Sequence, residues 1–194
     1  MGITMESHTL KNYVFFVPGK NQTKLKKQLD YYDQASFEDD YLHMEDIHES
    51  GGNQLSEESA LKAGDVLISN STYQATIVGR GNAGKVPTLN FSKVEFHSKG
   101  LDKYYFVYLF NCYPEILRQK ERELQGNGVI RRISTKSLGK FMIPIVALEE
   151  QEKIGKIYME ILNAQAKLRK ESNLLEQFTN QIIEGRLRGK ESNE

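Results

Sequence analysis

The last quarter of the chain constrains the fold more than any other part of the sequence. After Pro144 there is no further proline, and between Gly155 and Gly185 there is no glycine. Both residue types disfavour the interior of a helix, so their absence permits a long continuous helix. We expect this helix to run from about residue 149 to 186, which is roughly 38 residues and ~57 Å at 1.5 Å per residue.

Apolar residues recur along this segment with the spacing of the a and d positions of a heptad. The stripe comprises Ile154, Ile157, Ile161, Ala164, Leu168, Glu171, Leu175, Phe178 and Ile182. All but Ala164 and Glu171 are large and apolar. A helix of this length carries more apolar surface than a compact domain covers, so we expect the large apolar positions to pack against another helix. The alternative is a core helix of its own domain.

The chain before this helix has the pattern of an α+β domain with a mixed, mostly antiparallel sheet. Residues 101–125 favour a helix that is broken near Pro114, and a shorter helix is expected between residues 24 and 47. Segments with the composition or alternation of strands are 13–19, 66–69, 75–79, 90–98, 129–134 and 141–146. Pro144 suits a strand at the edge of a sheet. We therefore predict a domain over residues 1–147, followed by a coiled-coil-type helix over residues 148–190.

Composition argues against several classes of protein. The chain has 39% hydrophobic and 27% charged residues, as globular proteins do, and lacks the run of roughly 18 apolar residues that a membrane span needs. Its N-terminus lacks the pattern of a signal peptide, so a cytoplasmic location is expected. The histidines show no metal-ligand spacing with Cys112, the single cysteine, which we expect to be buried. We predict no metal site, no cofactor and no catalytic constellation.

Charge is unevenly distributed although the formal net charge is zero. Residues 27–65 contain eleven acidic residues against two lysines, whereas residues 80–140 contain twelve Lys and Arg against five Asp and Glu. Such asymmetry allows a neutral chain to carry a basic face, which suits a polyanionic partner. The alternative is that each charge is simply solvated.

Two glycine-containing loops lie in the basic segment. GRGNAGK, residues 79–85, has the spacing of a phosphate-binding loop, but Val86 stands where a hydroxyl would hold Mg²⁺, and Pro87 interrupts the required helix. We instead expect this loop to approach a polymer closely. In QGNGVIRRIS, residues 125–134, adjacent arginines point to opposite faces of the expected strand, so at most one lies inward. Surface solvation is the alternative here. The candidate contacts in both loops are Arg80, Asn82, Lys85, Asn127, Arg131 and Arg132.

Four segments together resemble the specificity subunits of type I restriction–modification systems. They are ALKAGDVLIS (60–69), the glycine-rich stretch that ends at Lys85, GNGVIRRIST (126–135) and LGKFMIPIVALEEQEKI (138–154). The last is a nearly complete family signature through Leu138, Ile143, Pro144, Leu148, Glu150, Gln151 and Ile154. It departs from the usual form at 146–147, where Val and Ala replace a second proline pair. The resemblance covers roughly residues 60–188.

This resemblance implies a non-catalytic subunit with a single target recognition domain that binds double-stranded DNA. The domain would read a half-site of a bipartite target, and the helix would set the distance to a second half-site. The implied protein partners are the methyltransferase subunit, which carries S-adenosylmethionine, and, where the system has one, the restriction subunit. A half-length form would form a homodimer through antiparallel helices, using Ile154, Ile157, Ile161, Leu168, Leu175, Phe178 and Ile182. The alternative is a coiled-coil interaction or regulatory protein with a similar domain.

Overall fold

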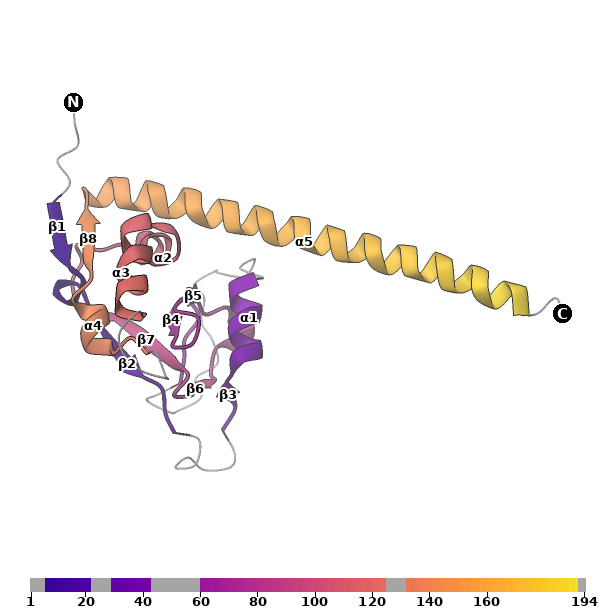
Figure 1. The fold of residues 1–194 in the computed structure, drawn as a ribbon, viewed down its shortest axis with the longest axis horizontal. Helices are drawn as coiled ribbons and strands as arrows, with labels where there is room; N and C mark the ends of the chain where they lie inside the picture. Colours follow the sequence, from indigo (N-terminus) through magenta and orange to yellow (C-terminus); the bar gives the residue numbers. More distant parts are fainter. Residues whose placement is uncertain (1–5, 22–28, 43–59, 125–131, 192–194) are drawn as a thin grey trace.

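A computed structural model of the chain describes residues 6–21, 29–42, 60–124 and 132–191 (Figure 1). One helix, α5 (Leu148–Glu191), runs along a body of strands and short helices and continues far beyond it (Figure 1). The predicted class, a mixed α+β domain followed by a long C-terminal helix, is confirmed. At 44 residues α5 is longer than the expected ~38, because it continues past Gly185 through Arg and Leu, which are good helix formers.

The body is built on a four-stranded antiparallel sheet in the order β2–β7–β4–β5. Val94 fixes the register of the central strands, because it pairs with Phe16 on one side and with Val66 on the other. All four strands lie in segments predicted as strands. They are β2 (Val14–Pro18), β4 (Val66–Ser69), β5 (Ala75–Ile77) and β7 (Phe91–Phe96).

Each face of this sheet covers its own apolar core. Val66 and Ile68 face the larger core, whereas Leu67 between them faces a smaller core that includes Phe37. This alternation follows from the two-residue period of a strand. In Figure 1 the body's helices lie on either side of the sheet, with α2 and α3 toward α5. The helices are α1 (Gln34–Leu42), α2 (Lys103–Cys112), α3 (Pro114–Leu124) and α4 (Thr135–Gly139).

The helix predicted over residues 101–125 is indeed broken before Pro114, which starts α3. Asp102 caps α2, since its side chain accepts a hydrogen bond from Tyr105 N at 2.8 Å. The expectation that Cys112 is buried is wrong. Cys112 is exposed at the last turn of α2, and its Sγ lies 3.6 Å from the hydroxyl of Tyr158.

Two short strand pairs complete the body. β1 (Glu6–Thr9) pairs antiparallel with β8 (Met142–Ile145), and β3 (Tyr31–Tyr32) pairs parallel with β6 (Val86–Pro87). Pro144 thus lies in a two-stranded pair, where a missing N–H is tolerated, as predicted. The strand predicted over 129–134 is wrong for residues 132–134, because the chain there leads into the N-cap of α4. Residues 129–131 lie outside the described part.

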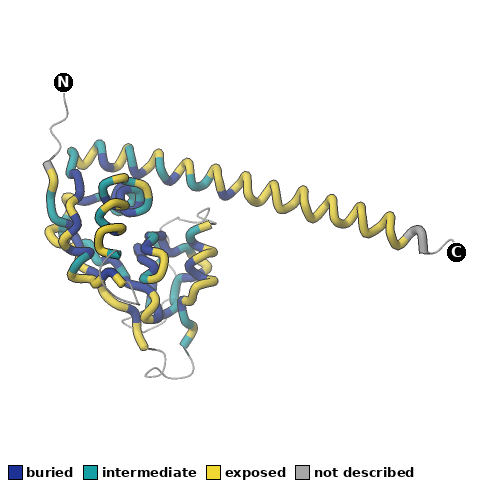
Figure 2. The backbone as a smooth tube through the Cα atoms, in the orientation of Figure 1, coloured by how far each residue is buried: buried dark blue, intermediate teal, exposed yellow. Residues whose placement is uncertain are grey.

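The two halves of α5 have different surroundings (Figure 2). Gln151, Gly155, Met159 and Ala166 are buried on the side that faces the body. From residue 167 to residue 188 every side chain is exposed. Among the described residues, no helix is both long and apolar enough to cross a membrane.

Candidate nucleic-acid interface and partner helix

The first glycine-containing loop is fastened to α1 by side chains that sequence reasoning assigned to ligand contact. Asn82, at the end of η4 (Arg80–Asn82), is only 3% exposed. Its Nδ2 donates to Asp40 Oδ1 at 2.8 Å and to Ser36 O at 3.2 Å. Because a buried amide must be hydrogen-bonded, these contacts fix the loop. Asn82, which was predicted as a contact, is therefore buried and holds the loop to α1.

Lys85, like Asn82, is hydrogen-bonded within the fold. It is half-buried, and its Nζ donates to Ser36 Oγ at 3.0 Å and to Asn82 Oδ1 at 2.8 Å. Arg80, by contrast, is exposed at the tip of the loop, next to Gly81, around which there is open space. The loop thus brings its three predicted residues together, but in different roles. Only Arg80 projects outward from a backbone that Asn82 and Lys85 hold in place.

Asp40 is the acceptor at the centre of this attachment. Its carboxylate accepts from Tyr32 OH at 2.7 Å and from Gly79 N at 3.0 Å as well as from Asn82. Burial raises the pKa of Asp40 above its ordinary value, against the opposing effect of these hydrogen bonds. Burial and the nearby Asp40 charge also raise the pKa of Tyr32. Part of the acidic segment is therefore used inside the fold, as support for the loop that carries Arg80.

The second loop is only partly within the described residues. Asn127 and Arg131 lie outside them, whereas Arg132 is exposed. The chain that follows is anchored, since Ile133 N donates to the hydroxyl of Tyr73 at 2.7 Å. Ser134 then caps α4 by accepting from Ser137 N at 3.0 Å. Arg132 thus stands one residue before a fixed point of the fold.

Lys120 belongs to the basic segment but not to its surface. It is 6% exposed, and its Nζ donates to Tyr73 O at 2.6 Å and to Phe110 O while lying over the Phe110 ring. Burial lowers the pKa of Lys120 from 10.5 to about 7. The amine therefore ties α3 to the end of α2 and to the turn at Tyr73, whose hydroxyl holds Ile133. Lys120 is one of the twelve Lys and Arg residues on which the prediction of a basic face was based, because composition carries no information about burial.

The start of α5 is locked to the body by Gln151, a residue of the family signature. Gln151 is 1% exposed, and its Nε2 donates to Gly100 O at 3.0 Å and to Val146 O at 2.8 Å. Its Oε1 accepts from Asp102 N at 3.0 Å. One turn later, a Cβ on Gly155 would lie 2.7 Å from Tyr104 Cβ, so only glycine allows this close approach to α2. These contacts fix the direction in which α5 leaves the body.

The apolar stripe of α5 points away from the side that faces the body. At 100° per residue, Ile157, Ile161 and Leu168 lie roughly opposite Gly155 and Met159. The exposed fractions of the large stripe residues are 57% for Ile157, 50% for Ile161, 65% for Leu168, 68% for Leu175, 61% for Phe178 and 46% for Ile182. Ile154, the first residue of the predicted stripe, instead packs against the core of its own body. The heptad pattern also leaves out Leu174, Ile183 and Leu187, which are exposed as well.

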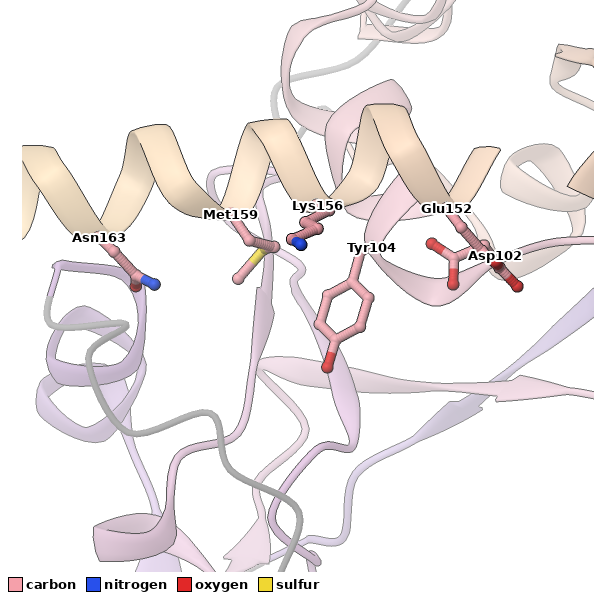
Figure 3. A pocket seen from close by; sticks show the side chains of 6 residues that line it. All are labelled: Asp102, Tyr104, Glu152, Lys156, Met159 and Asn163. Atoms are coloured by element: carbon pink, nitrogen blue, oxygen red, sulfur yellow. The ribbon is translucent and has the colours of Figure 1, made fainter. Parts of the chain in front are cut away.

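A pocket of about 450 Å³ lies between the start of α2 and α5 (Figure 3). Its polar lining includes Asp102, Glu152 and Lys156, and Met159 and Tyr104 supply apolar surface. Of these side chains, Asp102 also serves as the cap of α2. Within the described parts of the chain, no group of three metal-ligating side chains comes together.

The sequence matches the family model of the type I restriction modification DNA specificity domain over residues 12–177. This span includes the sheet, the short helices and more than half of α5. No curated protein matches the sequence.

Solved structures of specificity subunits resemble the fold. The HsdS subunit from Thermoanaerobacter tengcongensis gives a TM-score of 0.53 at 17% identity, covering 87% of this chain and 39% of that one. The S subunit from M. genitalium gives 0.55 at 15% identity, with coverage of 92% and 44%. A structure described by the complex assembly and conformational transition of the type I R-M system gives 0.61 at 17%, with coverage of 94% and 44%. The chain thus spans about two-fifths of the length of these structures.

Proposed function

The chain belongs to the family of type I restriction modification DNA specificity domains, and from this membership we propose that it reads one half-site of a bipartite DNA target. The observation that carries the proposal is the extent of the family match, which runs through the body and on into α5. The body binds double-stranded DNA, and the chain performs no chemistry of its own.

On this proposal the DNA contacts come from the two glycine-containing loops. Arg80 and Arg132 are both exposed. Arg80 directly follows Gly79, whose N–H is held by Asp40, and Arg132 directly precedes the anchored Ile133, which favours a defined geometry at phosphate or base edges. Asn127 and Arg131 of the second loop remain proposed contacts. Lys85 adds positive charge at the first loop, and Asn82 holds that loop in shape.

The homodimer is the second part of the proposal. The stripe from Ile157 to Ile182 is exposed along a helix that extends well past its own body. A second copy of α5, antiparallel to the first, would cover it and bring two recognition domains into one particle. Two identical half-sites would then make the target palindromic.

The methyltransferase subunit of the same system is the proposed protein partner, together with the restriction subunit where one exists. S-adenosylmethionine and the transfer of its methyl group belong to that partner. Support for this assignment comes from family membership.

The experiment that tests this function is methylome sequencing of cells with and without the gene. Deletion should abolish methylation at one bipartite motif with identical half-sites, and the wild-type gene should restore it. A double Arg80→Ala and Arg132→Ala variant should restore methylation less well, while a Lys167→Ala control should restore it fully. Unchanged methylation at every motif after deletion would show that the proposed function is wrong.

The exposed stripe also favours a second candidate, a coiled-coil interaction or regulatory protein that has the same fold. DNA binding separates the two, because a regulator of this kind would pair through α5 without a preferred DNA sequence. Footprinting of the chain with its methyltransferase subunit should protect two half-sites at a fixed spacing. Dimerisation without any protected sequence would favour the second candidate.

A further inference from the structure

A groove of about 400 Å³ between β2 and α4 is basic and lies outside the two glycine-containing loops. Lys11, Lys136 and Lys140 line it, and no acidic residue does. Lys11 belongs to η1 (Leu10–Asn12), whereas Lys136 lies in α4 and Lys140 at its C-cap. The three lysines therefore come from segments more than 120 residues apart that the fold brings to one place.

These segments are held firmly, so the convergence of the lysines is a property of the fold. Leu10 N donates to Phe141 O at 2.8 Å, which joins η1 to the chain just after α4. Leu10 and Leu138 are both fully buried in the larger core. Ser134 fixes the start of α4. The lysine backbones therefore keep their relative positions when a ligand arrives or leaves.

The groove lysines lack counter-charges. In the described portion of the chain, the ammonium groups of Lys11, Lys136 and Lys140 make no ion pair, whereas Lys93 on the same sheet pairs with Asp65 at 3.0 Å and Glu95 at 2.9 Å. Like charges gathered in one groove repel one another, and this repulsion disfavours the free fold. An anionic partner would relieve this repulsion. The cluster of lysines is therefore better explained by binding of an anion than by a contribution to the stability of the fold.

An exposed aromatic ring adjoins the same lysines. Phe15 lines the groove with 51% of its surface exposed, and its ring stacks on His97 at a centroid distance of 6.0 Å. Nε2 of His97 lies 3.2 Å from Lys11 O. A small inorganic anion would have no use for this apolar surface, whereas a sugar–phosphate chain presents charge and apolar edges together.

We propose that this groove binds the phosphodiester backbone of double-stranded DNA beside the half-site, with Lys11, Lys136 and Lys140 each contacting phosphate. The inference rests on the proposed DNA-binding function and adds a contact surface to it. Arg132, which is exposed, stands only three residues before the first groove residue of α4, Thr135, so this proposed loop contact lies close to the groove along the chain. On this proposal the loops contact base edges and give sequence specificity, whereas the groove contacts phosphates and contributes affinity that does not depend on sequence.

The test compares two triple variants of the full chain in the presence of its methyltransferase subunit. One carries Lys11→Gln, Lys136→Gln and Lys140→Gln. The matched control carries Lys156→Gln, Lys167→Gln and Lys170→Gln, which removes three exposed charges from α5. Binding to target and non-target duplexes is measured from low to high salt, with Tm and light scattering as checks of fold and dimer.

For the groove variant we expect the slope of log K against log salt to fall by about 2 to 3, since each phosphate contact contributes about 0.9. Affinity should fall roughly tenfold to a hundredfold for both duplexes, so that the preference for target is unchanged. Its Tm should equal or exceed that of the wild type, because repulsion is relieved. The control should bind as the wild type does.

Two results would overturn the inference while leaving the proposed function intact. One is an unchanged salt slope in the groove variant. The other is loss of target preference without loss of non-target binding, which would make the groove a base-reading site. A wild-type chain that binds no DNA, alone or with its partner, would instead refute the proposed function and the groove contact together.

Discussion

The two halves of α5 are built from similar residues but have opposite relations to the rest of the molecule. Up to Ala166 the helix is packed on α2, with Gln151, Gly155 and Met159 buried. Beyond Ala166 it carries Leu168, Leu174, Leu175 and Phe178, which no other described part of the chain covers. The first half is stabilised by its own body, whereas the second half leaves its apolar residues exposed.

The difference shows what each half contributes. Burying a large apolar side chain contributes about 1.5–3 kcal/mol, so a stripe of five or six such residues in each of two copies can offset the cost of association. In the first half, burial and hydrogen bonds instead fix the direction in which α5 leaves the body. The body-facing half determines where the helix points, and under the proposed dimer the exposed stripe would supply the contact with the second copy.

The largest effect should come from placing charge in the outward half. Leu168→Glu combined with Leu175→Glu would bury four carboxylates per dimer, so association should weaken more than about a thousandfold. Light scattering should show monomers. Thermal denaturation should show that the body of the variant is as stable as that of the wild type. Asn173→Glu with Asn180→Glu, on the opposite side of the helix, is the matched control and should stay dimeric. A persistent dimer in the leucine variant would place the interface elsewhere.

Removing the hydrogen bonds of Gln151 in the body-facing half should have the next largest effect, in this case on stability. Gln151→Leu leaves Gly100 O, Val146 O and Asp102 N without their partner, and we expect the free energy of unfolding to fall by roughly 2–4 kcal/mol. Gln177→Leu, in the outward half, should change it by less than about 0.5 kcal/mol. Chemical denaturation measures both. Equal small effects would mean that the hydrogen bonds of Gln151 do not hold the helix.

The two glycines of α5 offer a comparison within one helix. Gly155→Ala places a Cβ against Tyr104 Cβ and Tyr105 N, so we expect a loss of about 1–3 kcal/mol despite the better helix propensity of alanine. Gly185→Ala meets nothing within 4 Å and should stabilise the helix by up to about 1 kcal/mol. Opposite signs in thermal unfolding would confirm the difference, and like signs would contradict it.

The most gradual effect concerns pH. Burial lowers the pKa of Lys120 from 10.5 to about 7, so between these values the unfolded chain binds more protons than the folded body. Stability should therefore rise with pH across this window, by at most about 1.4 kcal/mol per unit, and the penalty should be complete below pH 7. Lys120→Met should flatten this rise. An unchanged slope in that variant would assign the pH dependence to another group.

The sequence predicts most of the elements because their signals are local. The alternation in 90–98, the break at Pro114 and the heptad stripe each depend on neighbours a few residues apart, and the structure confirms β7, the division of α2 from α3, and α5. The family signature likewise pointed to Gln151. The signature did not reveal the structural role of Gln151, because its hydrogen-bond partners include Gly100 and Asp102, which lie about fifty residues away in the sequence.

Side-chain roles were harder to predict than elements. Asn82 and Lys120 have the residue types of surface contacts, but their acceptors at Asp40, Tyr73 and Phe110 come together only in the folded chain. Cys112 lies in an apolar run, yet its position in the turn of α2 places it on the exposed side. Residue type and spacing do not determine burial when the covering element is distant in sequence.

The pairing of β1 with β8 has a consequence for the order of events during synthesis. It joins Glu6 to Ile145, nearly the longest separation that the body allows, so the body cannot close until its last strand has left the ribosome. The outward half of α5 is made only afterwards. By the time the exposed stripe emerges, the residues that complete the body are already available to fold. A nascent chain can therefore complete its own body before the exposed stripe becomes available to any partner.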